Sequence, residues 1–505
     1  MSLAVLASRA LHGMHAPEVL VEVHLAPGLP SFTIVGLPDT GVRESRERVR
    51  SAILSSGYTF PAGRLTANLA PADIQKESGR FDLPIALGVL LASGQITLSD
   101  QVARHILPNM VFAGELSLTG ALVPVAAPLV IALAAARSNH HSVLVLPSEN
   151  AQMAAQIPGL TVLGARSLQE VVQHLQESIP LTPVSADAWV DASDADVPCM
   201  SDVRGQAVAC RAVEIAASGG HGLLMSGPPG VGKSMLAQRL TGLLPRLDRE
   251  AAIEVTAIRS LREARAGFSN QVPMRAPHHS CTAAALIGGG SNPRPGEISL
   301  AHHGVLFLDE LPEFHRHVLE SLREPMERGE ICIARANRHI SYPCRFQLIA
   351  AMNPCPCGYL GSNHKPCRCT PEQIERYQGR LSGPFLDRID MLLTLTSPAR
   401  GWQHLPPSET SAVIRERVAI CRQRQQQRQG KLNARLDGAQ LTGDYGPEAE
   451  AGEFLSRAAD HWHWSARAVH RILRVARTIA DMADSSAIRL ADVKEAMTFR
   501  QQLTR

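Results

Sequence analysis

The chain has 505 residues, which is too long for one ordinary hydrophobic core, so its length predicts two to four domains. Hydrophobic residues make up 45% and charged residues 19%, a globular composition that excludes a largely disordered chain. The net charge is only +3, which excludes a protein that is basic over its whole surface. No apolar run is long enough to span a membrane, so we expect no membrane contacts. Arg9 interrupts the short apolar segment at the start of the chain, which predicts that this segment is the first strand of a cytoplasmic protein.

Residues 1–180 alternate between strand-like and helical patterns, which predicts a mixed α/β domain. We expect strands at residues 19–25, 31–37, 64–70, 111–116 and 142–147, and helices at 42–54, 82–92 and 126–137. Residues 181–201 are rich in Pro, Ser and Asp, which indicates a linker. Residues 202–400 contain the motifs with chemistry, and residues 401–505 have a helical, polar pattern.

A glycine-rich loop, GPPGVGKS, lies between an apolar segment and a helical one, as a P-loop requires. Its glycines let backbone amides turn toward phosphate oxygens at the positive end of a helix. We expect Lys233 to neutralise the β- and γ-phosphates of ATP and the Ser234 hydroxyl to bind Mg²⁺. The predicted nucleotide-binding residues are therefore Gly227, Pro228, Pro229, Gly230, Val231, Gly232, Lys233 and Ser234.

Two later apolar segments each end in polar residues that suit ATP hydrolysis. GVLFLDE predicts a buried strand, after which Asp309 can hold Mg²⁺ and Glu310 can polarise the attacking water. RFQLIAAMNP predicts another strand that ends at Asn353, whose amide can orient that water as a sensor residue. A strand-capping role for Asn353 is the alternative.

Several arginines are candidates for contacts with the γ-phosphate. Arg380 and Arg388 lie in GRLSGPFLDRID, and one of them could reach the nucleotide of a neighbouring subunit as an arginine finger. A surface ion pair is the alternative for either. An amphipathic helix over residues 464–482 is expected to begin at Ser465 as N-cap, and Arg467 could act near its start as a sensor in the same chain.

Together, GPPGVGKS, GVLFLDELPEF, LIAAMNPCPCG, RLSGPFLDRID and WSARAVHRILRVARTIADM resemble the magnesium-chelatase-like AAA+ ATPases, specifically the ComM (YifB) group. The resemblance covers essentially the whole chain. It implies an N-terminal Lon-protease-like domain, a P-loop AAA+ core with a helix-2 insert, and a C-terminal helical lid. It also implies a ring, usually a hexamer, with nucleotide at subunit interfaces. Arg388 then corresponds to the finger and Arg467 to sensor 2, and Arg380 is the second candidate for the finger.

Two segments are candidates for contacts with DNA in the pore of such a ring. Residues 265–299 form a Gly- and Pro-rich insertion that contains Arg275, and residues 329–346 predict a β-hairpin whose turn carries Arg335 and Arg338. A solvated turn is the alternative for the hairpin. Residues 411–436 hold seven Lys or Arg and one Glu, which fits either an arm near nucleic acid or a solvated linking helix.

Four cysteines lie within fifteen residues, in the pattern C-x-C, nine residues, C-x-C. Four thiolates can close a tetrahedral structural Zn²⁺ site, with His364 as a spare ligand. Free cysteines or a redox pair are the alternatives. We expect this loop to be structural or to face DNA rather than to belong to the hydrolytic site. The proposed ligands are Cys355, Cys357, Cys367 and Cys369.

The N-terminal third is similar to the Lon-protease-like fold but lacks its Ser–Lys dyad. Residues 121–136 contain no lysine, and residues 79–83 contain no serine. Ser78 lies nearby without an evident base. We therefore expect no peptidase activity and interpret the domain as a collar for oligomerisation or DNA contact.

The resemblance implies an ATP-driven ring helicase that promotes branch migration of incoming DNA in natural transformation. Its expected partners are single-stranded and branched DNA and further copies of itself, with recombination proteins as additional candidates. The alternative is a motor of the chelatase type that remodels a protein partner during metal insertion.

Overall fold

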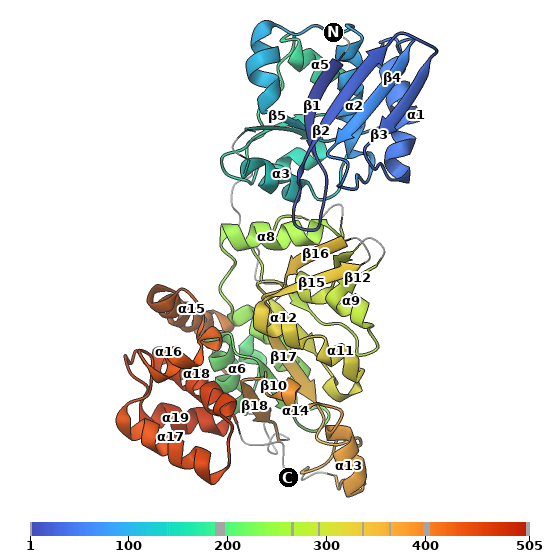
Figure 1. Ribbon diagram of the computed structural model, residues 1–505. Coiled ribbons are helices and arrows are strands. Elements are labelled where there is room, and N and C mark those ends of the chain that lie inside the picture. Colours follow the sequence, from blue (N-terminus) through green and yellow to red (C-terminus); the bar gives the residue numbers. More distant parts are fainter. Residues whose placement is uncertain are drawn as a thin grey trace. The chain divides into compact units, whose positions relative to one another are not determined.

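The computed structural model describes residues 3–138, 140, 142–186, 197–263, 267–290, 293–335, 338–362, 365–396 and 405–500 (Figure 1). The chain divides into two compact units. The first contains residues 1–190, 249–269 and 338–341, and the second contains residues 191–248, 270–337 and 342–505. None of the described helices is both long and apolar enough to cross a membrane.

The first unit is built on a seven-stranded mixed sheet in the order β3-β4-β2-β1-β5-β8-β9. β2 pairs antiparallel with β1 and β4, whereas the other neighbours are parallel. In β2, Val19, Val21 and Val23 are fully buried, as the alternating pattern of this segment predicts. The strands are β1 (Leu3–Arg9), β2 (Glu18–Ala26), β3 (Ser31–Val35), β4 (Arg64–Ala70), β5 (Met110–Phe112), β8 (Val143–Pro147) and β9 (Thr161–Ala165).

Helices cover both faces of this sheet. Successive side chains of a strand point to opposite faces of the sheet. Phe112 of β5 accordingly packs in one hydrophobic cluster with α1, α2 and α5. Its neighbour Val111 packs in a second cluster with α3, α4 and α8. The three helices expected from the sequence are confirmed as α1 (Thr40–Ser55), α2 (Asp82–Ala92) and α3 (Pro128–Ala136). The others are α4 (Ser148–Ala154), α5 (Leu168–Leu175) and α8 (Arg249–Ser260).

The single strand expected at residues 111–116 is wrong, because the chain turns at Gly114. β5 ends at Phe112, and β6 (Glu115–Leu116) pairs instead with β7 (Leu122–Val123) as a separate hairpin. The Gly114 amide donates to the Arg80 carbonyl, and a Cβ at Gly114 would lie 2.6 Å from Leu122 Cδ2. A side chain at this position would have to displace the end of the Leu122 side chain.

A five-stranded parallel sheet in the order β11-β14-β17-β10-β18 forms the centre of the second unit (Figure 1). Every residue of β10, β14 and β17 is buried, as is typical of parallel strands covered on both faces. Because the strands are parallel, all their carboxyl ends meet at one edge. The strands are β10 (Leu223–Ser226), β11 (Met274–Arg275), β14 (Val305–Leu308), β17 (Gln347–Met352) and β18 (Met391–Thr394).

Short elements occupy the predicted insertion and hairpin. The described part of residues 265–299 contains β11, α9 (Ala283–Ile287), β12 (Gly288–Gly289), β13 (Arg294–Pro295) and α10 (Glu297–Leu300). The hairpin prediction is confirmed, since β15 (Glu330–Arg335) and β16 (Arg338–Pro343) form a two-stranded sheet. The described helices of this unit up to residue 386 also include α6 (Ala207–Gly219), α7 (Lys233–Leu240), α11 (Arg316–Glu320), α12 (Arg323–Arg328), α13 (Pro371–Gln378) and α14 (Gly383–Leu386).

The elements after residue 405 are helical in the described range, as the sequence predicts, and Figure 1 shows them gathered together in orange and red. Ser465 is the N-cap of α18, where its side chain accepts a hydrogen bond from the Ala468 amide. The apolar face of α18 is buried, which explains its amphipathic sequence. The helices are α15 (Ser411–Gln429), α16 (Gly438–Thr442), α17 (Ala449–His461), α18 (Ala466–Met482) and α19 (Leu490–Thr498).

Candidate nucleotide site

The predicted hydrolytic residues meet at the carboxyl edge of the parallel sheet. The glycine-rich loop follows β10, Asp309 follows β14, and Asn353 follows β17. β17 lies between β14 and β10, so these three strand ends are neighbours. Segments that are far apart in the sequence therefore supply one cluster of side chains.

The backbone of the loop has the conformations that its glycines allow. Gly230 and Gly232 have φ angles of +78° and +90°, which other residues rarely adopt. Gly227 is required for space, because a Cβ there would lie 2.6 Å from the Leu395 carbonyl oxygen. A Cβ at Gly230, by contrast, would meet nothing within 4 Å. The loop leads into α7, whose positive end can bind phosphate.

Lys233 is buried at the start of α7 and is held by the loop. Its Nζ donates to the carbonyls of Gly227 (2.6 Å) and Pro228 (2.9 Å) and to Asn353 Oδ1 (3.0 Å). Burial lowers the pKa of Lys233, while the nearby Asp309 carboxylate acts to raise it. A triphosphate that enters the loop would replace these neutral acceptors with charged oxygens, which bind an ammonium group more strongly.

The two predicted Mg²⁺ ligands are in direct contact. The Ser234 hydroxyl donates to Asp309 Oδ2 at 2.6 Å, and Asp309 Oδ1 accepts from the Glu310 amide at 2.9 Å. A hydroxyl and a carboxylate beside a phosphate-binding loop are the oxygen donors that Mg²⁺ prefers when it binds with a nucleotide. These residues fit an ATP–Mg²⁺ complex.

The position of the Glu310 side chain is set by its backbone conformation and by a contact with a histidine. Its φ angle is +51°, an unusual value for a residue with a side chain. Glu310 Oε2 lies 3.0 Å from Nδ1 of His279, just after β11, and the His279 ring packs edge-on against Phe314. His279 lies in the predicted insertion, for which no hydrolytic role was expected. The pairing of the two-residue strand β11 with β14, which leaves no clear pattern in the sequence, brings His279 to Glu310.

A cavity of about 870 Å³ lies at the opposite, amino-terminal edge of the same sheet. Gly222, Gly304 and Gln347, at the starts of β10, β14 and β17, line it. Its positive side chains outnumber its carboxylates, so it suits a polyanion. The charged residues of its lining are Arg345, Arg388, Arg422, Lys431, Arg435, Arg467, Arg471 and Arg474, with Glu327, Asp387 and Asp390.

Arg388 and Arg467 therefore lie together, away from the nucleotide loop of their own chain. A strand of four residues such as β10 separates the two edges by about 13 Å. Arg388 pairs with Glu327 (2.6 Å) and donates to the Pro384 carbonyl, but its buried Nε bonds no group among the described residues. Arg380 instead pairs with Glu313 at 2.8 Å.

The three arginines proposed for DNA contacts lie in β11 and in the hairpin of β15 and β16. Arg275 in β11 forms an ion pair with Glu297 at 2.6 Å. Arg335 and Arg338 lie at the facing ends of β15 and β16, and their side chains lie outside the described part of the structure.

The basic segment that contains α15 folds against its own chain. Arg417 pairs with Glu214 (2.7 Å) and Glu409 (2.6 Å), and Arg428 pairs with Asp481 (2.5 Å). These ion pairs favour the linking-helix alternative over a free arm.

The four cysteines of the sequence pattern lie together in the segment 355–369, which we call the cysteine loop. Their sulfur atoms all lie within 4.8 Å of one another. Hydrogen bonds from the backbone amides of Arg368 and Tyr359 lower the pKa of Cys357 to about 6, whereas the pKa of Cys367 is raised to about 12 despite a hydrogen bond from the Cys369 amide, because burial and the neighbouring cysteines oppose its ionisation. His364 lies outside the described residues.

The cysteine loop, which the sequence predicts to be structural or to face DNA, lies beside the hydrolytic cluster. Its Gly358 packs on the nucleotide loop, and a Cβ at Gly358 would lie 2.8 Å from Pro229 Cδ and 3.7 Å from Asn353 Cγ.

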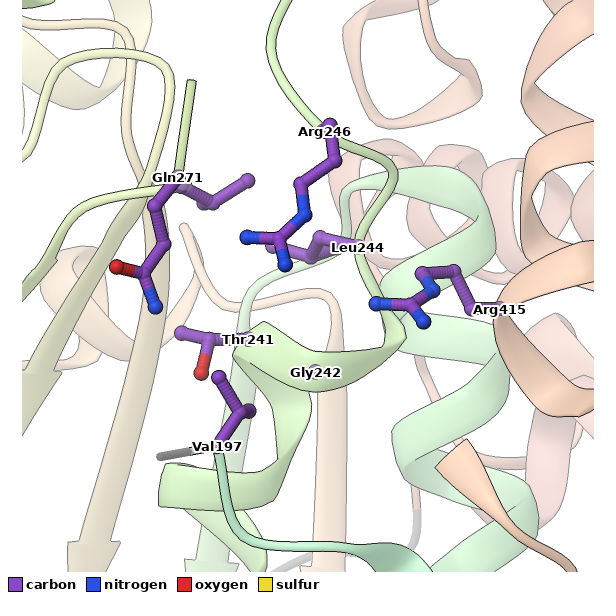
Figure 2. A pocket seen from close by; sticks show the side chains of 8 residues that line it. Val197, Thr241, Gly242, Leu244, Arg246, Gln271 and Arg415 are labelled. Carbon is purple, nitrogen blue, oxygen red and sulfur yellow. The ribbon is translucent and has the colours of Figure 1, made fainter. Parts of the chain in front are cut away.

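A second cavity, shown in Figure 2, is too small to be a ligand site. It encloses about 10 Å³, room for at most one water molecule, although Arg246 and Arg415 extend toward it. Its lining is Val197, Thr241, Gly242, Leu244, Arg246, Gln271, Val272 and Arg415.

Comparison with known families and proteins agrees with this arrangement. A family described as "Magnesium chelatase, subunit ChlI" matches residues 199–401. "Subunit ChlI of Mg-chelatase" matches residues 21–150, and "Magnesium chelatase, subunit ChlI C-terminal" matches residues 408–500.

Similar proteins cover nearly the whole chain. The chain is 47% identical to competence protein ComM of Haemophilus influenzae, over 99% of this chain and 98% of that protein. It is also 47% identical to the uncharacterized protein YifB of Escherichia coli, over 99% and 97%. A more distant match, 23% identical, is DNA helicase MCM8 of Gallus gallus, over 39% of this chain and 21% of that protein.

Proposed function

Because the chain belongs to the magnesium-chelatase-like AAA+ family that includes ComM and YifB, we propose that it is an ATPase that drives movement along DNA. The observation that carries the proposal is the cluster at the carboxyl edge of the parallel sheet. There Lys233 faces Asn353, and Ser234 contacts Asp309. In this proposal Lys233 binds the β- and γ-phosphates, Ser234 and Asp309 hold Mg²⁺, and Glu310 activates water.

The active particle is proposed to be a homohexameric ring. Arg388 and Arg467 line the cationic cavity at the other edge of the sheet, where they are separated from the nucleotide loop of their own chain. We therefore assign Arg388, as the finger, to the nucleotide of the neighbouring subunit. The sequence predicted that Arg467 acts as sensor 2 in its own chain; because Arg467 lines the same cavity as Arg388, we propose instead that it reaches the neighbouring nucleotide. A cationic cavity is suited to stabilise negative charge on a triphosphate.

The substrate is proposed to be single-stranded and branched DNA, and the reaction to be branch migration of incoming DNA in natural transformation. The name of the ComM relative, a competence protein, and that of MCM8, a DNA helicase, support this choice. Arg275, Arg335 and Arg338 are the proposed DNA contacts, and recombination proteins are further candidate partners. The proposal implies a cytoplasmic protein, where ATP is available.

The proposed domains follow the sequence analysis. Residues 1–180 form a Lon-protease-like domain without protease activity, and residues 181–201 form the linker. Residues 202–400 form the AAA+ core with a helix-2 insert, and residues 401–505 form the lid. The hydrogen bonds near Ser78 support the lack of a dyad, since the Ser78 hydroxyl accepts from Arg80 Nε and the nearby Lys76 ammonium donates to the Pro71 carbonyl. The four cysteines are proposed to hold a structural Zn²⁺.

The test is ATP hydrolysis by the purified chain with and without single-stranded DNA, followed by unwinding of forked and three-stranded substrates. We expect DNA to raise the ATPase rate and the branched substrates to be resolved. If neither responds at low salt, the DNA assignment is wrong. The second candidate, remodelling of a protein partner by a chelatase-type motor, would then be favoured, since the matching family models are named for magnesium chelatase.

A further inference from the structure

We propose that a metal ion in the cysteine loop fixes the nucleotide loop and Asn353, so that nucleotide affinity depends on zinc occupancy. This inference rests on the proposed ATP site and adds a positioning role to a loop whose sequence indicated only a structural metal. The cysteine loop would act as a clamp that is closed by Zn²⁺.

The spacing of the sulfur atoms fits a bound zinc ion. Cys355 Sγ lies 3.4 Å from Cys357 Sγ and 3.6 Å from Cys367 Sγ, and the last two are 3.6 Å apart. A disulfide requires about 2.05 Å. A tetrahedral site with Zn–S bonds of about 2.3 Å places its sulfurs about 3.8 Å apart, close to these values. The redox-pair alternative therefore fits less well than a metal site.

Backbone groups and nearby charges also suit a metal site. The Gly358 amide donates to the Cys355 carbonyl at 2.9 Å, and the Cys369 amide lies 3.4 Å from Cys367 Sγ as a donor to it. Four thiolates and Zn²⁺ carry a net charge of −2. The exposed Lys365 and Arg368 of the same loop can balance that charge.

The first turn of the cysteine loop lies on the nucleotide loop. Gly358 has a φ angle of +83°, and a Cβ there would lie 2.8 Å from Cδ and 2.9 Å from Cγ of Pro229. Pro229 is otherwise exposed at the tip of the nucleotide loop. The Gly358 backbone therefore supports one side of the loop that is proposed to surround the phosphates.

The same loop also fixes Asn353, which precedes Cys355 by only two residues. Gln378 of α13 donates to the Pro354 carbonyl at 3.0 Å, so α13, which follows Cys369, holds the other end of the connection. Asn353 Oδ1 in turn accepts from Lys233. Without the metal, nothing joins the four sulfur atoms, so the loop loses its cross-link and the support that it gives to Pro229 and Asn353.

The experiment uses the full chain and measures two quantities, zinc content by elemental analysis and the Kd for a fluorescent ADP analogue. The variants are the double substitution Cys355→Ser/Cys367→Ser, the substitution Gly358→Val and the matched control Cys332→Ser, which changes an exposed cysteine outside the loop. We expect wild type and Cys332→Ser to contain one zinc ion per chain and to bind alike. The double variant should lose zinc and bind at least about tenfold more weakly.

Gly358→Val tests the contact between the cysteine loop and the nucleotide loop without replacing a proposed zinc ligand. It leaves the four ligands in place, and elemental analysis reports whether the strain of a side chain at a φ of +83° releases zinc. In chains that retain zinc, the new side chain meets Pro229 and should weaken nucleotide binding by a similar factor. Wild-type affinity in the zinc-free double variant or in Gly358→Val, or a wild-type chain without zinc, would overturn the clamp. A zinc-containing wild-type chain that binds no nucleotide would instead overturn the proposed ATP site, and the clamp with it.

Discussion

Replacing Asp390 with Asn should destabilise the second unit, because this carboxylate joins the sheet to the C-terminal helices. Asp390 is 7% exposed, immediately before β18. Its oxygens lie 3.2 Å from Arg471 Nη1 in α18, 3.3 Å from His221 Nδ1, and 3.3 Å from the Gly222 amide, which donates to it. Removing one partner of a buried ion pair costs about 3–5 kcal/mol, since the other charge stays buried.

The pKa of Asp390 gives this prediction a pH window. Burial alone would raise that pKa, but the hydrogen bond with His221 and the charge of Arg471 hold it well below its usual range. A carboxylate with a lowered pKa adds stability that is fully present above its unfolded pKa, about 3.9, and is lost as the pH falls further. The difference between Asp390→Asn and wild type should therefore be constant near neutral pH and shrink below about pH 4.

Thermal unfolding followed by circular dichroism measures the effect. At roughly 2 °C per kcal/mol for a large domain, we expect the Tm of Asp390→Asn to fall by at least about 6 °C at pH 7. The matched control is Asp387→Asn, because Asp387 is 44% exposed and its ion pair with Arg500 is long at 3.7 Å. An equal, small shift in both variants would refute the role of Asp390 as a buried link.

Three further substitutions test the hydrolytic cluster. Lys233→Ala should abolish detectable ATP binding in a fluorescence titration, because it removes the cation that faces the phosphates. Glu310→Gln should retain ATP binding while lowering kcat about 10²–10⁴-fold in a phosphate-release assay, and a smaller loss would argue against a general base. His279→Ala should lower kcat about tenfold with unchanged ATP affinity, because His279 orients Glu310.

The parts of the site that follow local rules could be predicted from the sequence. The glycine-rich loop must form between β10 and α7, and Asp309 and Asn353 follow buried apolar runs that can only be central parallel strands. Since the carboxyl ends of parallel strands meet, the cluster with Lys233 follows from the order of these segments.

Contacts set by packing between distant segments could not be predicted. His279 reaches Glu310 only because β11 lies beside β14, and the pairing of such a short strand leaves no clear pattern in the sequence. Gly358 meets Pro229 because the cysteine loop turns back over the nucleotide loop. The pairing of β6 with β7 similarly brings Leu122 next to Gly114, a contact that the sequence pattern does not reveal.

The central claim is that ATP is hydrolysed at an interface to which two subunits contribute. Arg388→Ala chains keep an intact Glu310, and Glu310→Gln chains keep an intact Arg388, so mixing them creates interfaces with both residues. We predict that each variant alone is nearly inactive, since an arginine finger contributes about 10³–10⁵-fold to kcat, and that the mixture regains a measurable part of the wild-type ATPase rate. A mixture no more active than its separate components would contradict the shared site.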